Sequence, residues 1–251
     1  MSRRLLLAAL SVLLVALATA CQVRTTVVVA VDDDGSGTVE VAVGLDADAL
    51  GGVPDLDGDG TSGPADLAAL VRRDDLVAAG WTVSDPEVDA DGATWLRATR
   101  RFGTPEEADQ VLAGLTGPSG PLRDMHVTRT ESFGRTRYGF TGTFDLSGGL
   151  EAFGDEGLAA ALDGEPLGED AAAIELRAGQ PLADAFTFEV AARLPGAEQT
   201  WSPRLGDGPV EMQADSTRND WPVLGLAQVA VLSLVALAGV LVRRTDRVRR
   251  T

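Results

Sequence analysis

Two uncharged apolar segments lie near opposite ends of this chain, and they limit the length of the domain that can fold between them. Leu5–Ala18 follows two arginines near the first residue, and Pro222–Val242 precedes an arginine-rich end. Roughly 195 residues lie between the segments, which is enough for one domain with its own core. Cys21 is the only cysteine. The intervening domain therefore has no internal disulfide, and its stability depends on apolar packing.

The first apolar segment has the parts of a secretory signal peptide. Arg3 and Arg4 supply a positive start, the 14-residue apolar segment is too short to cross a bilayer, and small residues precede Cys21. In a bacterial lipobox, a cysteine at this place becomes the first mature residue and carries diacylglycerol. We predict that residues 1–20 form a lipoprotein signal peptide and that Cys21 is lipidated. The alternative is an ordinary secretory signal followed by a chance cysteine.

The second apolar segment is 21 residues long and carries no charge. A helix of that length spans the hydrocarbon core of a bilayer. Trp221 suits the outer interface, and the five arginines that follow Val242 are typical of a cytoplasmic end. We predict a transmembrane helix over 222–242 and a cytoplasmic tail over 243–251; the alternative is a helix buried in a soluble domain. The protein is then expected at the plasma membrane, with its domain outside the cytoplasm.

The exported part of the chain is strongly acidic. Without the signal peptide and the tail, 14 basic and 37 acidic residues remain, a net charge of −23. That charge excludes nucleic acid as a partner. Residues 92–140 are the exception, with seven arginines against five acids. We expect Arg97, Arg101, Arg135 and Arg137 to contact anionic lipid head groups; the alternative is that they are solvated and pair with neighbouring acids.

Alternating apolar and polar residues predict hairpins with helices between them. Two Val-rich runs, 25–31 and 38–43, flank a turn of Asp, Gly and Ser, and similar pairs are expected at 81–88 with 94–101 and at 122–131 with 135–144. Helical spacing predicts a helix over 66–79, and Thr104 followed by Pro and two Glu predicts the start of a second helix. We expect an α+β fold, a mostly antiparallel sheet of hairpins with two helices packed on one face.

The later part of the domain gives weaker signals. Strands are expected at 174–177, 185–192, 199–202 and 209–214. We predict an extracytoplasmic domain over 21–215, with an acidic loop at 44–65, a Gly-rich acidic loop at 147–170, and a linker at 216–221.

One acidic segment has the spacing of a calcium-binding loop. The candidate ligands are Asp55, Asp57, Asp59, Thr61 through its carbonyl, and Asp66, with Gly60 at the sharp turn. Three features differ from an EF-hand. An EF-hand has Glu at the position of Asp66, a helix that enters the loop, and usually a second, paired copy, and this sequence shows none of the three. The alternative is a solvated acidic loop in which Asp66 caps the following helix. Ca²⁺ is the one candidate cofactor.

The sequence contains no catalytic signature, and we expect no enzyme activity. His126 is the only histidine and lies on a predicted strand, where a hydrogen-bonded structural role is commoner than catalysis. No Gly-x-Ser-x-Gly elbow and no phosphate-binding loop occur. The alternative is a hydrolase that uses His126.

The order of these segments resembles the actinobacterial LppM family of envelope lipoproteins. Features that carry the likeness are Cys21, the Val-rich hairpin, the hairpin 81–101, the Thr104 helix start, Leu194-Pro195-Gly196 before Trp201, and Trp221 before the span and the Arg-rich tail. The resemblance implies a surface lipoprotein without catalysis that binds envelope lipid or glycolipid. Two alternatives stay open: a Ca²⁺-stabilised structural or protein-interaction module, and the hydrolase.

Overall fold

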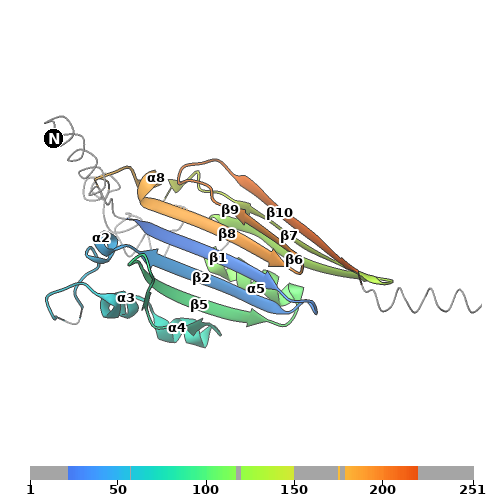
Figure 1. The fold of residues 1–251 in the computed structure, drawn as a ribbon, viewed down its shortest axis with the longest axis horizontal. Coiled ribbons are helices and arrows are strands. Elements are labelled where there is room, and N and C mark those ends of the chain that lie inside the picture. The colour runs from blue at the N-terminus through green and yellow to red at the C-terminus, as the bar shows by residue number, and fades with distance from the viewer. Residues whose placement is uncertain (1–21, 57, 117–119, 150–174, 176–178, 220–251) are drawn as a thin grey trace, which may run out of the picture.

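The structure is a computed structural model that describes residues 22–56, 58–116, 120–149, 175 and 179–219 (Figure 1). Strands in two sheets and a few helices make up these residues, which confirms the α+β class. Several predictions fall outside the described residues: the signal peptide, Cys21, Asp57, almost all of the loop 147–170, most of the strand 174–177, the span 222–242 and the tail.

The large sheet has the strand order β3-β5-β2-β1-β8-β9, and β4 also pairs with β5. The bounds of its strands are β1 Val23–Val31, β2 Gly37–Leu45, β3 Thr82–Val83, β4 Glu87–Val88, β5 Thr94–Phe102, β8 Phe186–Leu194 and β9 Ala197–Trp201. The first predicted hairpin is confirmed as β1 and β2, whereas the expected strand at 81–88 is two short strands. All pairs are antiparallel except β1 with β8, so the sheet is mixed.

A second, smaller sheet departs from the single sheet that we expected. Its order is β10-β7-β6, with β6 Leu122–Ser132, β7 Arg135–Phe144 and β10 Val210–Asn219. The predicted hairpin 122–144 is confirmed as β6 and β7. Strand β10 continues to Asn219 because every residue from Val210 onward pairs with β7, so most of the predicted linker 216–221 is strand.

Five helices are found among the described residues: α2 Ala47–Leu50, α3 Pro64–Leu70, α4 Arg73–Ala78, α5 Pro105–Thr116 and α8 Leu182–Ala185. The predicted acidic loop 44–65 therefore includes the end of β2, all of α2 and the first two residues of α3. The single helix expected over 66–79 is wrong, since Val71 takes an extended ψ of 127° between α3 and α4.

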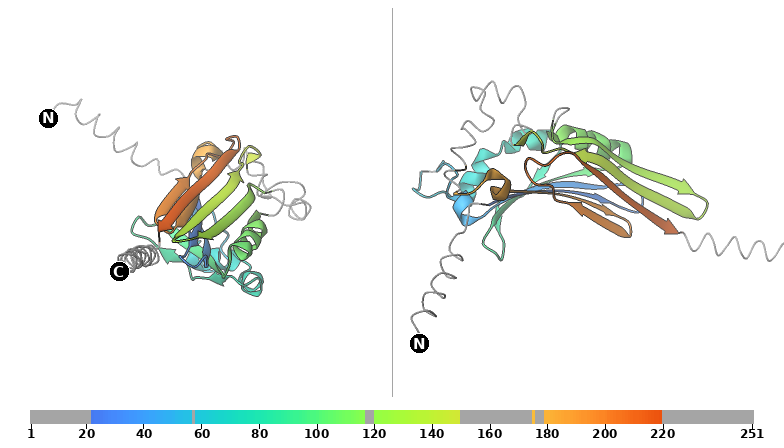
Figure 2. Two further views of the ribbon diagram at one scale, coloured as in Figure 1. Left: turned by 90° about the vertical axis from the view of Figure 1, so that its right-hand side faces the viewer. Right: turned by 90° about the horizontal axis from the view of Figure 1, so that it is seen from above.

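The helix predicted from Thr104 is confirmed as α5. The Thr104 hydroxyl accepts the Glu107 N–H (3.3 Å), and the Glu107 carboxylate accepts the Gly103 N–H (2.7 Å). These bonds satisfy amides that have no partner within the helix. α5 packs along β6, so that α5 and the small sheet together cover one face of the large sheet (Figure 2).

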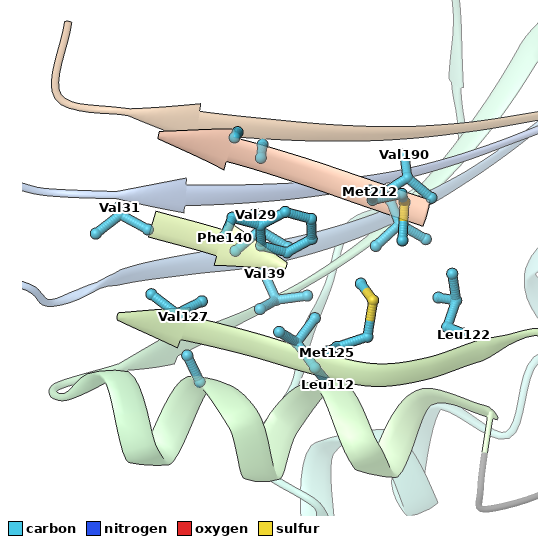
Figure 3. Packing of buried hydrophobic residues seen from close by; sticks show 14 of the residues in the cluster. Val29, Val31, Val39, Leu112, Leu122, Met125, Val127, Phe140, Val190 and Met212 are labelled. Carbon is cyan, nitrogen blue, oxygen red and sulfur yellow. The ribbon is translucent and has the colours of Figure 1, made fainter. Parts of the chain in front are cut away.

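The main core lies between the two sheets and α5 (Figure 3). Val29 and Val39 from the large sheet, Phe140 from the small sheet and Leu112 from α5 have no exposed surface. A second cluster, around Leu45 and Leu67, lies under α2 and α3 on the same face of the large sheet. No helix or strand among the described residues covers the opposite face of the large sheet (Figure 2).

Candidate functional site

An apolar cavity of about 160 Å³ lies in the main core between the two sheets. Its lining comes from both sheets and from the last turn of α5, and Figure 3 shows two of its residues, Leu122 and Val190. The lining residues are Thr25, Val27, Val41, Leu115, Pro121, Leu122, Phe144, Phe188, Glu189 and Val190. Because nearly all of these side chains are apolar, the cavity suits an apolar group and offers little to a polar one.

The size of the cavity limits what it can hold. A dry cavity of about 150 Å³ binds benzene, and pockets for whole ligands usually measure ~300–1,000 Å³. A volume of about 160 Å³ therefore admits an aromatic ring or the end of an alkyl chain. The cavity reaches Thr25, the third residue of β1, and so lies toward the end of the domain that follows Cys21.

His126 lies in an open groove between α5 and β6. Its Nδ1 is 2.9 Å from Oδ2 of Asp109, whose other oxygen accepts the Val127 N–H at 2.8 Å. Asp109 thus connects α5 to β6, and His126 has a hydrogen-bond partner of the kind expected of a structural histidine on a strand. The other residues of the groove are Gln110, Ala113, Leu122, Arg123, Asp124 and Met125. None of these described lining residues has a hydroxyl or thiol that a catalytic histidine would activate.

Arg123, which lines this groove, makes an ion pair with a residue that follows β7. The Arg123 guanidinium lies 3.2 Å from a carboxylate oxygen of Asp145. Hydrogen bonds from the Ser147 hydroxyl and amide hold the pKa of Asp145 below its usual value, and the charge of Arg123 lowers it further. Between β6 residues Arg123 and His126 the strand has an irregular register, and Asp124 there takes a positive φ of 51°.

The four arginines predicted to contact head groups lie on two opposite outer surfaces. In β5, Leu96 and Phe102 point into the cores, so Arg97 and Arg101 point to the open face of the large sheet. In β7, Tyr138 and Phe140 point into the core, so Arg135 and Arg137 lie on the outer face of the small sheet.

The ion pairs of these arginines also differ. Arg97 pairs with Glu87 at 3.3 Å, and its guanidinium lies 5.6 Å from the ring centre of Trp95, which fits the solvated alternative. Arg101, Arg135 and Arg137 make no ion pair with any described residue. The small sheet therefore carries two such candidates for contact with anions, side by side on one face of β7, and the large sheet carries one.

The acidic loop is closed by hydrogen bonds to its own backbone. The two carboxylate oxygens of Asp66, which is only 1% exposed, accept the N–H groups of Leu56 (2.6 Å) and Gly63 (2.8 Å). Asp55 accepts from Gly58 (2.7 Å) and Gly60 (2.9 Å). Asp66 thus has the capping role that we gave as the alternative to a ligand.

The described ligand candidates do not converge on one point. Asp59 accepts from the amide and hydroxyl of Thr61, both at 2.8 Å. Within the described ranges, no three His, Cys, Asp or Glu residues are grouped so that they could hold a metal ion. Gly60 nevertheless has the positive φ, 88°, that the sixth residue of a calcium loop requires. Calcium binding stays a prediction.

The two points where the described chain begins and ends lie at opposite ends of the domain (Figure 1). At one end, the Gln22 amide donates to Asp46 at 2.8 Å, and β1 starts at the next residue. At the other end, Arg218 of β10 donates to Asp33, which follows β1, at 2.6 Å. Since β1 has nine residues, about 30 Å separates these two ends.

Comparisons with known proteins leave the chain without an assigned family. No protein-family model matches the sequence, and no curated protein matches it. Of the helices that the structure describes, none has both the length and the apolar character required to cross a bilayer.

Nothing local in the sequence predicted the cavity. Its residues come from strands β1, β2, β6, β7 and β8 and from α5, and each of them fits an ordinary core position when read alone. The one hint was the alternation of apolar residues in those strands, which indicates a buried face but not a gap in its packing.

Proposed function

We propose that the protein is an envelope lipoprotein of the LppM type that holds the acyl end of an envelope lipid or glycolipid. The observation that carries the proposal is the apolar cavity of about 160 Å³ between the sheets. A cavity lined by Val, Leu and Phe side chains favours a hydrocarbon chain, whose burial is worth about 0.8 kcal/mol per CH₂ group. The head group would stay outside the domain.

Two membrane attachments would set the pose of the domain. β1 begins two residues after Cys21, and β10 ends three residues before Pro222, a reach of at most about 10 Å. These tethers are much shorter than the distance of about 30 Å between the two ends of the domain. If both attachments enter one bilayer, the domain lies lengthwise along its outer leaflet.

The proposed function is binding without catalysis. The groove at His126 joins a histidine to a carboxylate, but its described lining offers no nucleophile. A hydrolase that forms a covalent intermediate would need one. The structural role of Asp109, between α5 and β6, accounts for the pair.

Filling the cavity tests this function. Val41 lines the cavity from β2, and Val41→Phe places a larger side chain in that volume. We expect the wild-type domain, residues 22–219 secreted without its anchors, to carry acyl lipid that is released on extraction and identified by mass spectrometry. We expect Val41→Phe to carry about tenfold less, a loss of ~1.4 kcal/mol of binding.

Val43→Phe is the matched control. Val43 lies on the same strand and the same face as Val41, but it packs on the second cluster and does not line the cavity. Circular dichroism would establish that both variants fold. A wild-type domain that carries no lipid, or equal lipid in both variants, would contradict the proposal.

A calcium-stabilised module is the second candidate function, favoured by the positive φ of Gly60 and its bond to Asp55. In that case millimolar Ca²⁺ raises the melting temperature above the value in EDTA, because a ligand at 100 times its Kd stabilises by about 2.7 kcal/mol. The rise should be lost in Asp59→Asn, which changes an exposed carboxylate of the loop. Equal melting temperatures with Ca²⁺ and with EDTA in the wild type would exclude this function.

A further inference from the structure

The turn between β6 and β7 exposes an aromatic ring to water. Phe133 is 76% exposed, more than the other large apolar residues exposed in the described part of the chain. The turn itself needs Gly134, whose φ is 67°, and it is closed by a bond of 3.3 Å from the Ser132 hydroxyl to the Arg135 carbonyl. Neither feature requires an aromatic residue at 133, so the fold does not explain the ring.

This turn lies beside the last described residue of β10. Asn219 is paired with Arg135, the first residue of β7, and Ser132 is paired with the same arginine from the other side. Figures 1 and 2 both show the hairpin tip next to the point where β10 ends. The predicted span begins three residues later, at Pro222. The tip of the hairpin is therefore close to the place where the chain would enter the membrane.

On the outer face of the small sheet, the charges near the tip favour an anionic surface. The acidic β1–β2 turn, Asp32–Asp34, lies at the same end but on the inner side, where the Tyr138 hydroxyl donates to the Asp33 carbonyl and Arg218 pairs with the Asp33 carboxylate. Arg135 and Arg137 point outward from the small sheet and make no ion pair with any described residue. The nearest acid on the hairpin, Glu131, is paired with Arg129 at 2.5 Å. The two acids on the outer face of β10, Asp215 and Glu211, lie opposite Gly139 and Thr143, farther along the strands from the tip. On a domain of net charge −23, two arginines that pair with no described acid, beside an exposed ring, form an unusual surface.

We propose that the β6–β7 turn inserts Phe133 into the interface of the outer leaflet, with Arg135 and Arg137 on the phosphates of anionic lipids. Aromatic rings are favoured at the level of the head groups, and arginines near an anionic surface are attracted to it. The inference rests on the proposed function, because the span at 222–242 brings the tip to the membrane. It adds a third contact, made by the folded domain itself.

A fluorescent label at the tip tests the insertion. The full chain with Phe133→Cys, labelled with an environment-sensitive dye, is reconstituted into vesicles of phosphatidylcholine and phosphatidylglycerol that carry brominated acyl chains. We expect the dye to be quenched about threefold more than a dye on Thr141→Cys, because an interfacial group lies ~5–10 Å below the head-group surface. Thr141 is exposed on the same face of β7 as Arg135 and Arg137, and it lies about 20 Å from the tip of the hairpin.

A second experiment tests the role of the arginines by adding Arg135→Glu and Arg137→Glu to the labelled Phe133→Cys chain. In the anionic vesicles, we expect quenching of the dye at position 133 to fall toward the level seen for the Thr141 label. The Phe133→Cys chain without these two changes should show the same fall in vesicles of pure phosphatidylcholine. A chain that fails to float with the vesicles overturns both the membrane function and this inference. A chain that floats while both labels are quenched equally overturns the inference alone.

Discussion

Phe140→Ala lowers the free energy of unfolding of the domain by about 4 kcal/mol, the usual cost of removing a buried aromatic side chain. Phe140 has no exposed surface, and its ring centre lies 5.8 Å from that of Trp201 in β9. The substitution therefore opens a cavity where the small sheet meets the edge of the large sheet. In a domain of this size the melting temperature falls by ~12 °C, which thermal unfolding followed by circular dichroism measures.

Phe133→Ala is the control for that result. It removes the same side chain from the same hairpin, but at a position that is 76% exposed. Surface changes of this kind stay within ~0.5 kcal/mol, so the melting temperature should hardly move. If the two variants lost equal stability, the burial assigned to β7 would be wrong. A stable Phe133→Ala also makes this residue suitable for membrane experiments.

Sequence patterns predicted those parts of the fold that depend on local chemistry. The β1–β2 turn contains Asp, Gly and Ser, and its geometry is fixed by short-range bonds such as that of Gly35 to Asp32 (3.0 Å). The start of α5 follows from Thr104 and Glu107, which bond within the same turn. Because both features need only neighbouring residues, they could be read from the chain.

Partners that are distant in sequence could not be predicted in this way. The parallel pairing of β1 with β8 joins Val27 to Val190, and alternation in either strand indicates a buried face without naming the neighbour. The same applies to β10, which pairs with β7 in a second sheet instead of with β9. Helical spacing over 66–79 also failed, because Leu70 and Val77 are 49% and 56% exposed and do not bury one continuous stripe.

The candidate sites also divide into those that depend on neighbouring residues and those that depend on distant ones. Asp66 as a helix cap was one of two local alternatives, and the structure provides its bonds. The arginines of residues 92–140 formed one basic sector in sequence, but strand parity and two sheets place Arg97 and Arg137 on opposite outer faces. The sequence alone could not distinguish Arg97, which is paired with Glu87, from Arg135 and Arg137 near the hairpin tip, because the distinction depends on how the two sheets are placed.

The other large effect is expected for Gly37→Ala. Gly37 is the first residue of β2, and a Cβ there would lie 2.0 Å from the Ala30 carbonyl oxygen and 2.5 Å from the Phe102 ring. The oxygen belongs to the backbone of a central strand, so it cannot turn aside as a side chain would. We expect a loss of about 3 kcal/mol, at the upper end of the cost of overpacking, measured by urea unfolding.

Gly114→Ala provides the comparison for a glycine without such a contact. Gly114 lies on an exposed part of α5, and nothing is within 4 Å of the Cβ that alanine would add. Alanine is favoured over glycine in a helix by ~0.5–1 kcal/mol, so this variant should be slightly more stable than the wild type. The two glycine variants then differ in sign. A Gly37→Ala domain as stable as the wild type would show that β1 and β2 are not packed as closely as their register requires.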